Sequence, residues 1–324
     1  FGPLRWGFDA IHPYRVVPAL LLALTWLGAC AFLRALLGPG LTRAQAAIGA
    51  SAWTALYTHL MPDMPEGFYW YTGSVTYQLP CALTLIAVTL LMRAARERSW
   101  WAAVLAIPLL FVIVGCNEVI MLLLVIASGV VIARWVASPG RTSTFLIIAV
   151  PVIVLSACLV IFAPGNEVRS AFYPERHVLP RSVGMSLLQT ARFSFEWMTC
   201  PGLLLLSVIW WMSHRHLAQR FPLIGYGLGL DPWKSVPALF AVVFLCVFPA
   251  YWSTGILGQH RTANVACFFF LPLWFVNLSV FAARFGGTVL RLHDTDRRHV
   301  TAALLLLIAL DLGFTGNSGN AIKD

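Results

Sequence analysis

Long, nearly uncharged apolar runs recur along the whole chain, and they limit what it can fold into more than any other feature. The runs are about 20 residues long, the length that a helix needs to cross the hydrocarbon core of a bilayer. Hydrophobic residues make up 59% of the chain and charged residues only 11%, whereas average proteins have about 25% charged residues. The alternating pattern of membrane-barrel strands is absent. We therefore expect an all-α fold, a polytopic transmembrane helical bundle that forms a single domain over residues 1–324.

About ten spans follow from these runs. They cover roughly residues 15–37, 44–61, 77–95, 99–114, 118–136, 144–162, 190–212, 236–253, 265–283 and 299–314. The second is rich in small residues, which favours a short or tilted helix. The seventh joins "ARFSFEWMT" to "PGLLLLSVIWW", which favours an interfacial helix followed by a short span. Because the sequence starts at Phe1 and ends just after an apolar run, we expect it to be a portion of a longer protein.

Basic residues orient the predicted spans. Most of the 22 lysines and arginines lie in one alternating set of connections, which the positive-inside rule assigns to the cytoplasm. The stretches that look unlike simple connectors then all lie on the opposite side: 8–15, 61–80, 115–118, 163–181, 255–264 and 315–320. We therefore expect the functional loops on the extracytoplasmic side.

Several function classes find no support in the residues. The formal net charge is +9, but the arginines are scattered between spans, so we expect no nucleic-acid partner. The seven cysteines stand singly, without CxxC or His-rich ligand spacing, so we expect no metal site and no disulfide framework. No P-loop, GxGxxG, GxSxG or HExxH motif occurs, so we expect no nucleotide or other cofactor. An enzyme of this kind must take a substrate that arrives in the membrane.

Glu118 interrupts an apolar stretch that runs from Trp100 to Val136. A carboxylate at membrane depth costs several kcal/mol unless it is paired or wetted, which makes Glu118 a functional candidate. The plainer interpretation is that Asn117 and Glu118 only turn the chain at the membrane interface. Both interpretations stay open at this point.

The segment "APGNEVRSAFYPERHVLPR" places arginines on the extracytoplasmic side, against the topology rule. Asn166 belongs to turn chemistry, whereas Arg169 and Arg176 suit the binding of phosphate oxygens by their guanidinium groups. The phosphate could belong to a lipid headgroup or to a lipid-linked substrate.

Two further features lie on the same side. His260 and Arg261 begin the ninth span, where a histidine can exchange a proton or simply sit at the interface. Asp311 near the outer end of the last span is a similar weak signal.

The stretch "EGFYWYTGSVTYQLP" holds four consecutive rings and a fifth at Tyr77. A Trp and Tyr belt is normal at a membrane interface, but four consecutive rings cannot all face lipid. Trp70, Tyr71 and Tyr77 can stack on sugar rings, and Thr72 can bond sugar hydroxyls. We expect them to line a sugar or acceptor site.

Taken together, "GFYWYTGSVTYQLP", "GCNEVIMLLLVIA", "APGNEVR" and "HRTAN" resemble a bacterial family of multi-pass proteins that look like polyprenyl-phosphate-dependent glycosyltransferases of the GT-C class and are often labelled glucosyltransferase-like. The resemblance covers roughly residues 60–265. It implies location in the bacterial inner membrane, a GT-C-like bundle and a site on the periplasmic or extracellular face.

The resemblance also implies a reaction. A sugar would pass from a polyprenyl-phosphate carrier to an acceptor, which is a glycan, a lipid or a protein. The usual base of GT-C enzymes is an acidic residue in the first outer loop. Asp9 is the only acidic residue left there, so Glu118, Asp9 or a residue upstream would be the catalytic carboxylate. Membrane lipids and the lipid-linked sugar are the expected partners.

Two other functions stay open. A transporter or flippase for a lipid-linked or anionic substrate would use the same arginines and Glu118, although no internal repeat of the kind common in transporters is visible. A non-catalytic membrane subunit of a larger complex would show no reaction of its own.

Overall fold

The structure is a computed structural model that describes residues 11–138, 143–225, 229–257, 260–286 and 294–314. Side chains are described except those of residues 11–15, 169, 170 and 294–298. The described part is helical throughout. Its elements are α1 (Ile11–Leu37), α2 (Arg43–Leu60), η2 (Pro65–Tyr69), α3 (Tyr71–Gly73), η3 (Ser74–Gln78), α4 (Leu79–Glu97), α5 (Trp100–Cys116), α6 (Glu118–Ala137), α7 (Thr144–Ile161), α8 (Pro164–Ala171), α9 (Leu179–Met198), α10 (Pro201–Arg220), α11 (Pro222–Gly225), α12 (Pro232–Thr254), α13 (Arg261–Phe285) and α14 (Asp294–Phe314).

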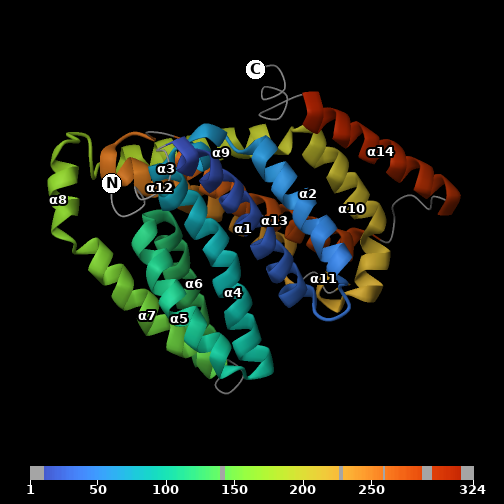
Figure 1. Ribbon diagram of the computed structural model, residues 1–324, viewed down its shortest axis with the longest axis horizontal. Helices are drawn as coiled ribbons and strands as arrows, with labels where there is room; N and C mark the ends of the chain where they lie inside the picture. Colours follow the sequence, from blue (N-terminus) through green and yellow to red (C-terminus); the bar gives the residue numbers. More distant parts are fainter. Residues whose placement is uncertain (1–10, 139–142, 226–228, 258–259, 287–293, 315–324) are drawn as a thin grey trace.

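Apolar helices form a multi-pass bundle, as the sequence predicts (Figure 1). Six of the described helices are long and apolar enough to cross a membrane, namely α1 from Val16, α3 to α4 taken as one segment, α6, α7, α12 and α13. The pair α9 and α10 passes the same test together but is bent by 68°, so it forms at most one broken span. This bend lies in the predicted seventh span, where an interfacial helix and a short span were expected. The count of ten spans stays a prediction.

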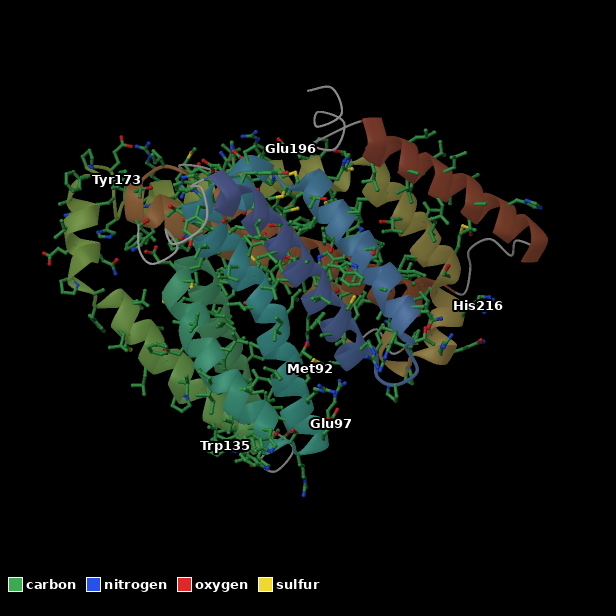
Figure 2. The ribbon with its side chains drawn as sticks, in the orientation of Figure 1. Met92, Glu97, Trp135, Tyr173, Glu196 and His216 are labelled. Atoms are coloured by element: carbon green, nitrogen blue, oxygen red, sulfur yellow. The ribbon has the colours of Figure 1, made fainter. Side chains whose placement is uncertain are left out.

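The connections between the helices lie at two opposite ends of the bundle (Figure 2). Glu97 and Trp135 lie at one end, next to the short connections that the charge pattern assigns to the cytoplasm. Tyr173 and Glu196 lie at the opposite end, where α8 and α9 lie. Tyr173, which belongs to the predicted extracytoplasmic segment 163–181, thus lies at the opposite end from Glu97 and Trp135.

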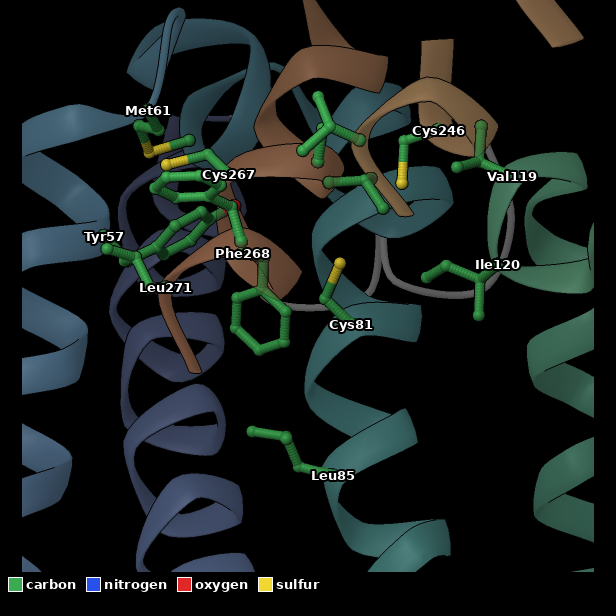
Figure 3. Close-up of a cluster of buried hydrophobic side chains, with 14 of the residues drawn as sticks. Tyr57, Met61, Cys81, Leu85, Val119, Ile120, Cys246, Cys267, Phe268 and Leu271 are labelled. Atoms are coloured by element: carbon green, nitrogen blue, oxygen red, sulfur yellow. The ribbon is translucent and has the colours of Figure 1, made fainter. Parts of the chain in front are cut away.

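Helix α13 lies at the centre of the main buried cluster, which Figure 3 shows in part. Phe268 packs edge-on against Tyr57 of α2, with ring centroids 5.1 Å apart. Cys81 from α4 and Cys246 from α12 add small buried side chains that let the helices approach. The outward faces of α7 and α9 stay apolar and exposed, for example at Leu159. Exposed apolar surface of this extent is typical of contact with lipid.

A buried polar network joins three elements within this apolar core. The Tyr57 hydroxyl donates to Gln78 Oε1 at 2.6 Å, and Gln78 Nε2 donates to Thr25 Oγ1 at 3.0 Å. Thr25 in turn donates to the Leu21 carbonyl at 2.7 Å. Buried polar groups need such partners, because an unsatisfied one costs its full desolvation penalty. The network therefore fixes η3 against α1 and α2.

We predict that Gln78→Leu destabilises the protein by about 1–3 kcal/mol, because the buried Tyr57 hydroxyl loses its acceptor. The double variant Tyr57→Phe/Gln78→Leu should lose less than the sum of the two single variants, since neither polar group is then left unsatisfied. The free energies of unfolding of these variants in detergent measure the losses. Gln219→Leu, at an exposed position of α10, is the control. A Gln78→Leu variant as stable as this control would contradict the role of the network.

Candidate functional site

A cavity of about 730 Å³ lies where η3, α5, α6, α7, α8, α12 and α13 come together. Its wall holds five residues that the sequence analysis selected from separate segments: Tyr77, Asn117, Glu118, Asn166 and Arg261. Hydroxyl groups from α7 and α12 alternate with apolar side chains in the rest of the wall. The cavity therefore combines a carboxylate, a guanidinium and amides with an apolar surface.

Asn117 and Glu118 form the junction between α5 and α6. The Asn117 side-chain oxygen accepts hydrogen bonds from the backbone N–H groups of Val119 and Ile120 at 2.8 and 3.1 Å, which caps α6. Its amide nitrogen donates to the Thr76 carbonyl at 3.2 Å and so ties α6 to η3. Asn117 therefore does shape the turn, as the plainer interpretation held. The same cap places Glu118 at the first position of α6 and on the cavity wall.

The Arg261 guanidinium is held on three sides. Its Nε lies 3.6 Å from Glu66 Oε2, and its central carbon lies 4.1 Å from the ring centroid of Trp70 and 5.5 Å from that of Tyr77. Only 19% of the Arg261 side chain is exposed. A partly desolvated cation gains most from such aromatic faces. The rings expected to bind a ligand thus hold the cation that lines the cavity.

Glu66 belongs to a turn that is fastened to α13. Its backbone N–H donates to Asp63 Oδ1 at 2.9 Å. Asp63 in turn exchanges two hydrogen bonds with the Asn264 side chain: its N–H donates at 3.0 Å and its carbonyl accepts at 2.6 Å. Burial raises the pKa of Glu66, and the Asp63 charge raises it further, while Arg261 and His260 oppose the rise.

The connection from α8 to α9 closes one side of the cavity with Tyr173. It is pinned to the end of α12 by the His177 N–H, which donates to the Trp252 carbonyl at 2.9 Å. Gly255 lies beneath it with φ of +76°, and a Cβ there would come within 2.8 Å of the Glu175 carbonyl oxygen. Only glycine fits both the left-handed backbone and this close approach.

The remaining predicted site residues lie apart from the cavity wall. Tyr71 and Thr72 are exposed on the surface, and Trp70 reaches the site only through Arg261. His260 packs edge-on against Phe193, with centroids 6.1 Å apart. Arg176 follows Tyr173 in the same connection and is not part of the wall.

Two predicted residues cannot be placed in the site. Asp9 lies outside the described residues. Arg169 lies on the backbone of α8, and its side chain is outside the described part.

Sequence reasoning missed Glu66 and Asn264. Glu66 is the single charge of the aromatic stretch, and Asn264 is the polar residue just inside the apolar ninth span. Both were visible as isolated polar residues. Nothing in the spacing of the sequence could pair Glu66 with Arg261, or Asn264 with Asp63. The pairs join parts of the chain about 200 residues apart.

Comparison of the chain with protein-family models, curated proteins and solved structures finds no match.

We predict a pH dependence of stability that comes from Glu66. The folded protein binds the Glu66 proton more tightly than the unfolded chain does. The wild type therefore loses stability relative to Glu66→Gln as the pH rises from the ordinary glutamate pKa of 4.5 through the raised pKa of the folded state. Unfolding of both proteins in detergent between about pH 4 and pH 8 measures the difference. Asp63→Asn removes a charge that raises the pKa, so it should move this window to lower pH. A difference that stays constant with pH would contradict the assignment.

Proposed function

We propose that this protein is an integral-membrane glycosyltransferase that transfers a sugar from a polyprenyl-phosphate carrier to an extracytoplasmic acceptor. The observation that carries the proposal is the joint presence of Glu118 and Arg261 on the wall of one cavity. Glycosyl transfer from a lipid phosphate needs a base for the acceptor hydroxyl and a cation for the departing phosphate. The described part of the chain supplies one of each at this cavity.

Arg261 suits the phosphate. Its Nε edge faces Glu66, and its planar fork can still offer its terminal nitrogens to phosphate oxygens. The stacked rings fix its plane, so little conformational entropy is lost when a ligand binds. In this proposal Arg169 and Arg176, which flank Tyr173 in the chain, are further candidates for binding the phosphate.

Glu118 suits the acceptor. In the proposed step, Glu118 takes the proton of an acceptor hydroxyl, and the hydroxyl oxygen forms a bond to the anomeric carbon of the sugar. The bond from that carbon to the phosphate oxygen breaks, and its electron pair leaves with the phosphate. Arg261 stabilises the charge that develops on that oxygen. Asp9 stays the second candidate for the base.

Helix α7 offers a place for the lipid chain. Ser156, Leu159 and Val160 line the cavity, while Leu155 and Leu159 on the same helix are 65% and 66% exposed, so Leu159 lies at the edge between the cavity and the outer surface. A polyprenyl tail can therefore lie along the outer surface of α7 while its phosphate sugar occupies the cavity. The other residues of the wall, including Asn166 and Tyr77, then face the sugar or the acceptor.

The proposal includes a GT-C-like arrangement of ten spans in the bacterial inner membrane, with the cavity open to the periplasmic or extracellular side. The position of α8, α9 and the cavity at one end of the bundle supports it.

The test is transfer of label from a panel of radiolabelled hexosyl polyprenyl phosphates to isolated envelope acceptors by the purified protein. We predict that Glu118→Gln lowers the rate by about 100-fold or more, the usual contribution of a general base. Arg261→Lys should also lower it, because lysine keeps the charge and loses the planar fork.

Arg192→Gln is the matched control, since Arg192 pairs with Glu196 on exposed α9 at 2.9 Å. It should retain the wild-type rate. Full activity of both Glu118→Gln and Arg261→Lys would overturn the site. Movement of the intact labelled lipid across a liposome bilayer, without transfer, would point to the transporter or flippase.

A further inference from the structure

A second cluster of reactive side chains lies away from the cavity, where α2, the α9–α10 bend and α14 meet. His59 lies in the last turn of α2, Cys200 lies at the bend, and Asp311 lies near the end of α14. One potential ligand atom from each residue lies within 4.8 Å of the other two. Helix α14 contacts both α10 and α2, and Figure 1 shows it at one edge of the bundle.

The spacing of these atoms resembles that of metal ligands. His59 Nε2 lies 3.5 Å from Asp311 Oδ2, and Cys200 Sγ lies 3.9 Å from the same oxygen. In a tetrahedral zinc site with bonds of about 2.0–2.3 Å, ligand atoms lie about 3.3–3.6 Å apart. The nitrogen already lies at that distance from the oxygen, and a shift of a few tenths of an ångström brings the sulfur to it.

The side chains of the cluster are buried, so a charge on any of them is costly unless it is compensated. The His59 and Asp311 side chains are only 3% and 7% exposed, and Cys200 is 9% exposed. A buried carboxylate needs a cation or several hydrogen bonds close by. A divalent metal ion supplies that charge directly and is ligated by all three kinds of side chain.

The backbone supports the carboxylate in the orientation that a ligand needs. The Gly202 N–H, in the first turn of α10, donates to Asp311 Oδ2 at 2.8 Å. A Cβ on Gly202 would lie 2.8 Å from the same oxygen, so a larger residue there would displace the carboxylate from this position. Hydrogen bonds of this kind orient metal-ligating carboxylates from the outer shell.

We propose that His59, Cys200 and Asp311 bind one divalent transition-metal ion, with zinc as the best match. Imidazole, thiolate and carboxylate together favour zinc or cobalt over magnesium or calcium, which prefer oxygen ligands alone. Three protein ligands leave the fourth tetrahedral position for water or another small ligand. The metal also joins α2, α10 and α14 across more than 250 residues of sequence, which is about the separation of His59 from Asp311. This site stands independently of the proposed glycosyl transfer.

The test uses the full chain, purified in detergent and treated with a chelator, and then titrated with Co²⁺ alone. We expect one equivalent to bind, with the near-ultraviolet charge-transfer band of a cobalt thiolate and a rise in melting temperature. Zn²⁺ should displace the cobalt and abolish the band. Cys200→Ser should lose the band, and Asp311→Asn should bind cobalt more than about 100-fold more weakly, beyond the loss of about 10–100-fold that outer-shell changes cause.

Asp311→Asn keeps an oxygen that can accept from Gly202, so its unfolding without metal reports whether the fold is intact. Cys158→Ser, at an exposed cysteine of α7, is the control and should bind cobalt as the wild type does. Wild-type protein that shows no thiolate band, or Cys200→Ser with an unchanged cobalt spectrum, would overturn the proposal. The cluster would then be only a hydrogen-bonded cap on α10.

Discussion

The positive charge of Arg261, held in mostly apolar surroundings, is the constraint on which the site depends. A guanidinium there needs a counter-charge and polarisable neighbours. Glu66, Trp70 and Tyr77 provide both, and they come from the turns that precede α4. This requirement explains why two of the rings in this short segment, Trp70 and Tyr77, lie beside the guanidinium.

The same segment is held from two other directions. Asn264 fastens its beginning to α13, and the bond of Gln78 to Tyr57 fastens its end to α2. The wide π-helical turns η2 and η3 lie between these fixed points, and such turns are frequent at functional sites. The Thr76 carbonyl in η3 accepts from Asn117, which caps α6. The segment from Asp63 to Gln78 thereby sets the position of Glu118 relative to Arg261.

The helices could be predicted well from the sequence because lipid demands long apolar runs. The run predicted at 118–136 is helix Glu118–Ala137, and the mixed seventh run is indeed broken. The site could be predicted only in part. Glu118 stood out as a charge in an apolar stretch, and Arg261 was a weaker signal at the start of the ninth span, but their supporting partners depend on contacts between distant segments. The same holds for His59 and Asp311, which no local spacing rule could join to Cys200.

Pro151 lies inside α7, and the half of this helix that follows it, from Ser156 to Val160, lines the cavity. A proline removes one backbone hydrogen bond and pushes its ring against the preceding turn, so a helix bends there more easily than elsewhere. Helix α7 packs mainly on α5 and α6 and exposes its other face. The outer half of α7 is therefore a wall segment that can tilt at low cost. If the cavity takes a lipid-linked sugar as proposed, a bend at this one residue can widen it for a bulky headgroup without a rearrangement of the rest of the bundle.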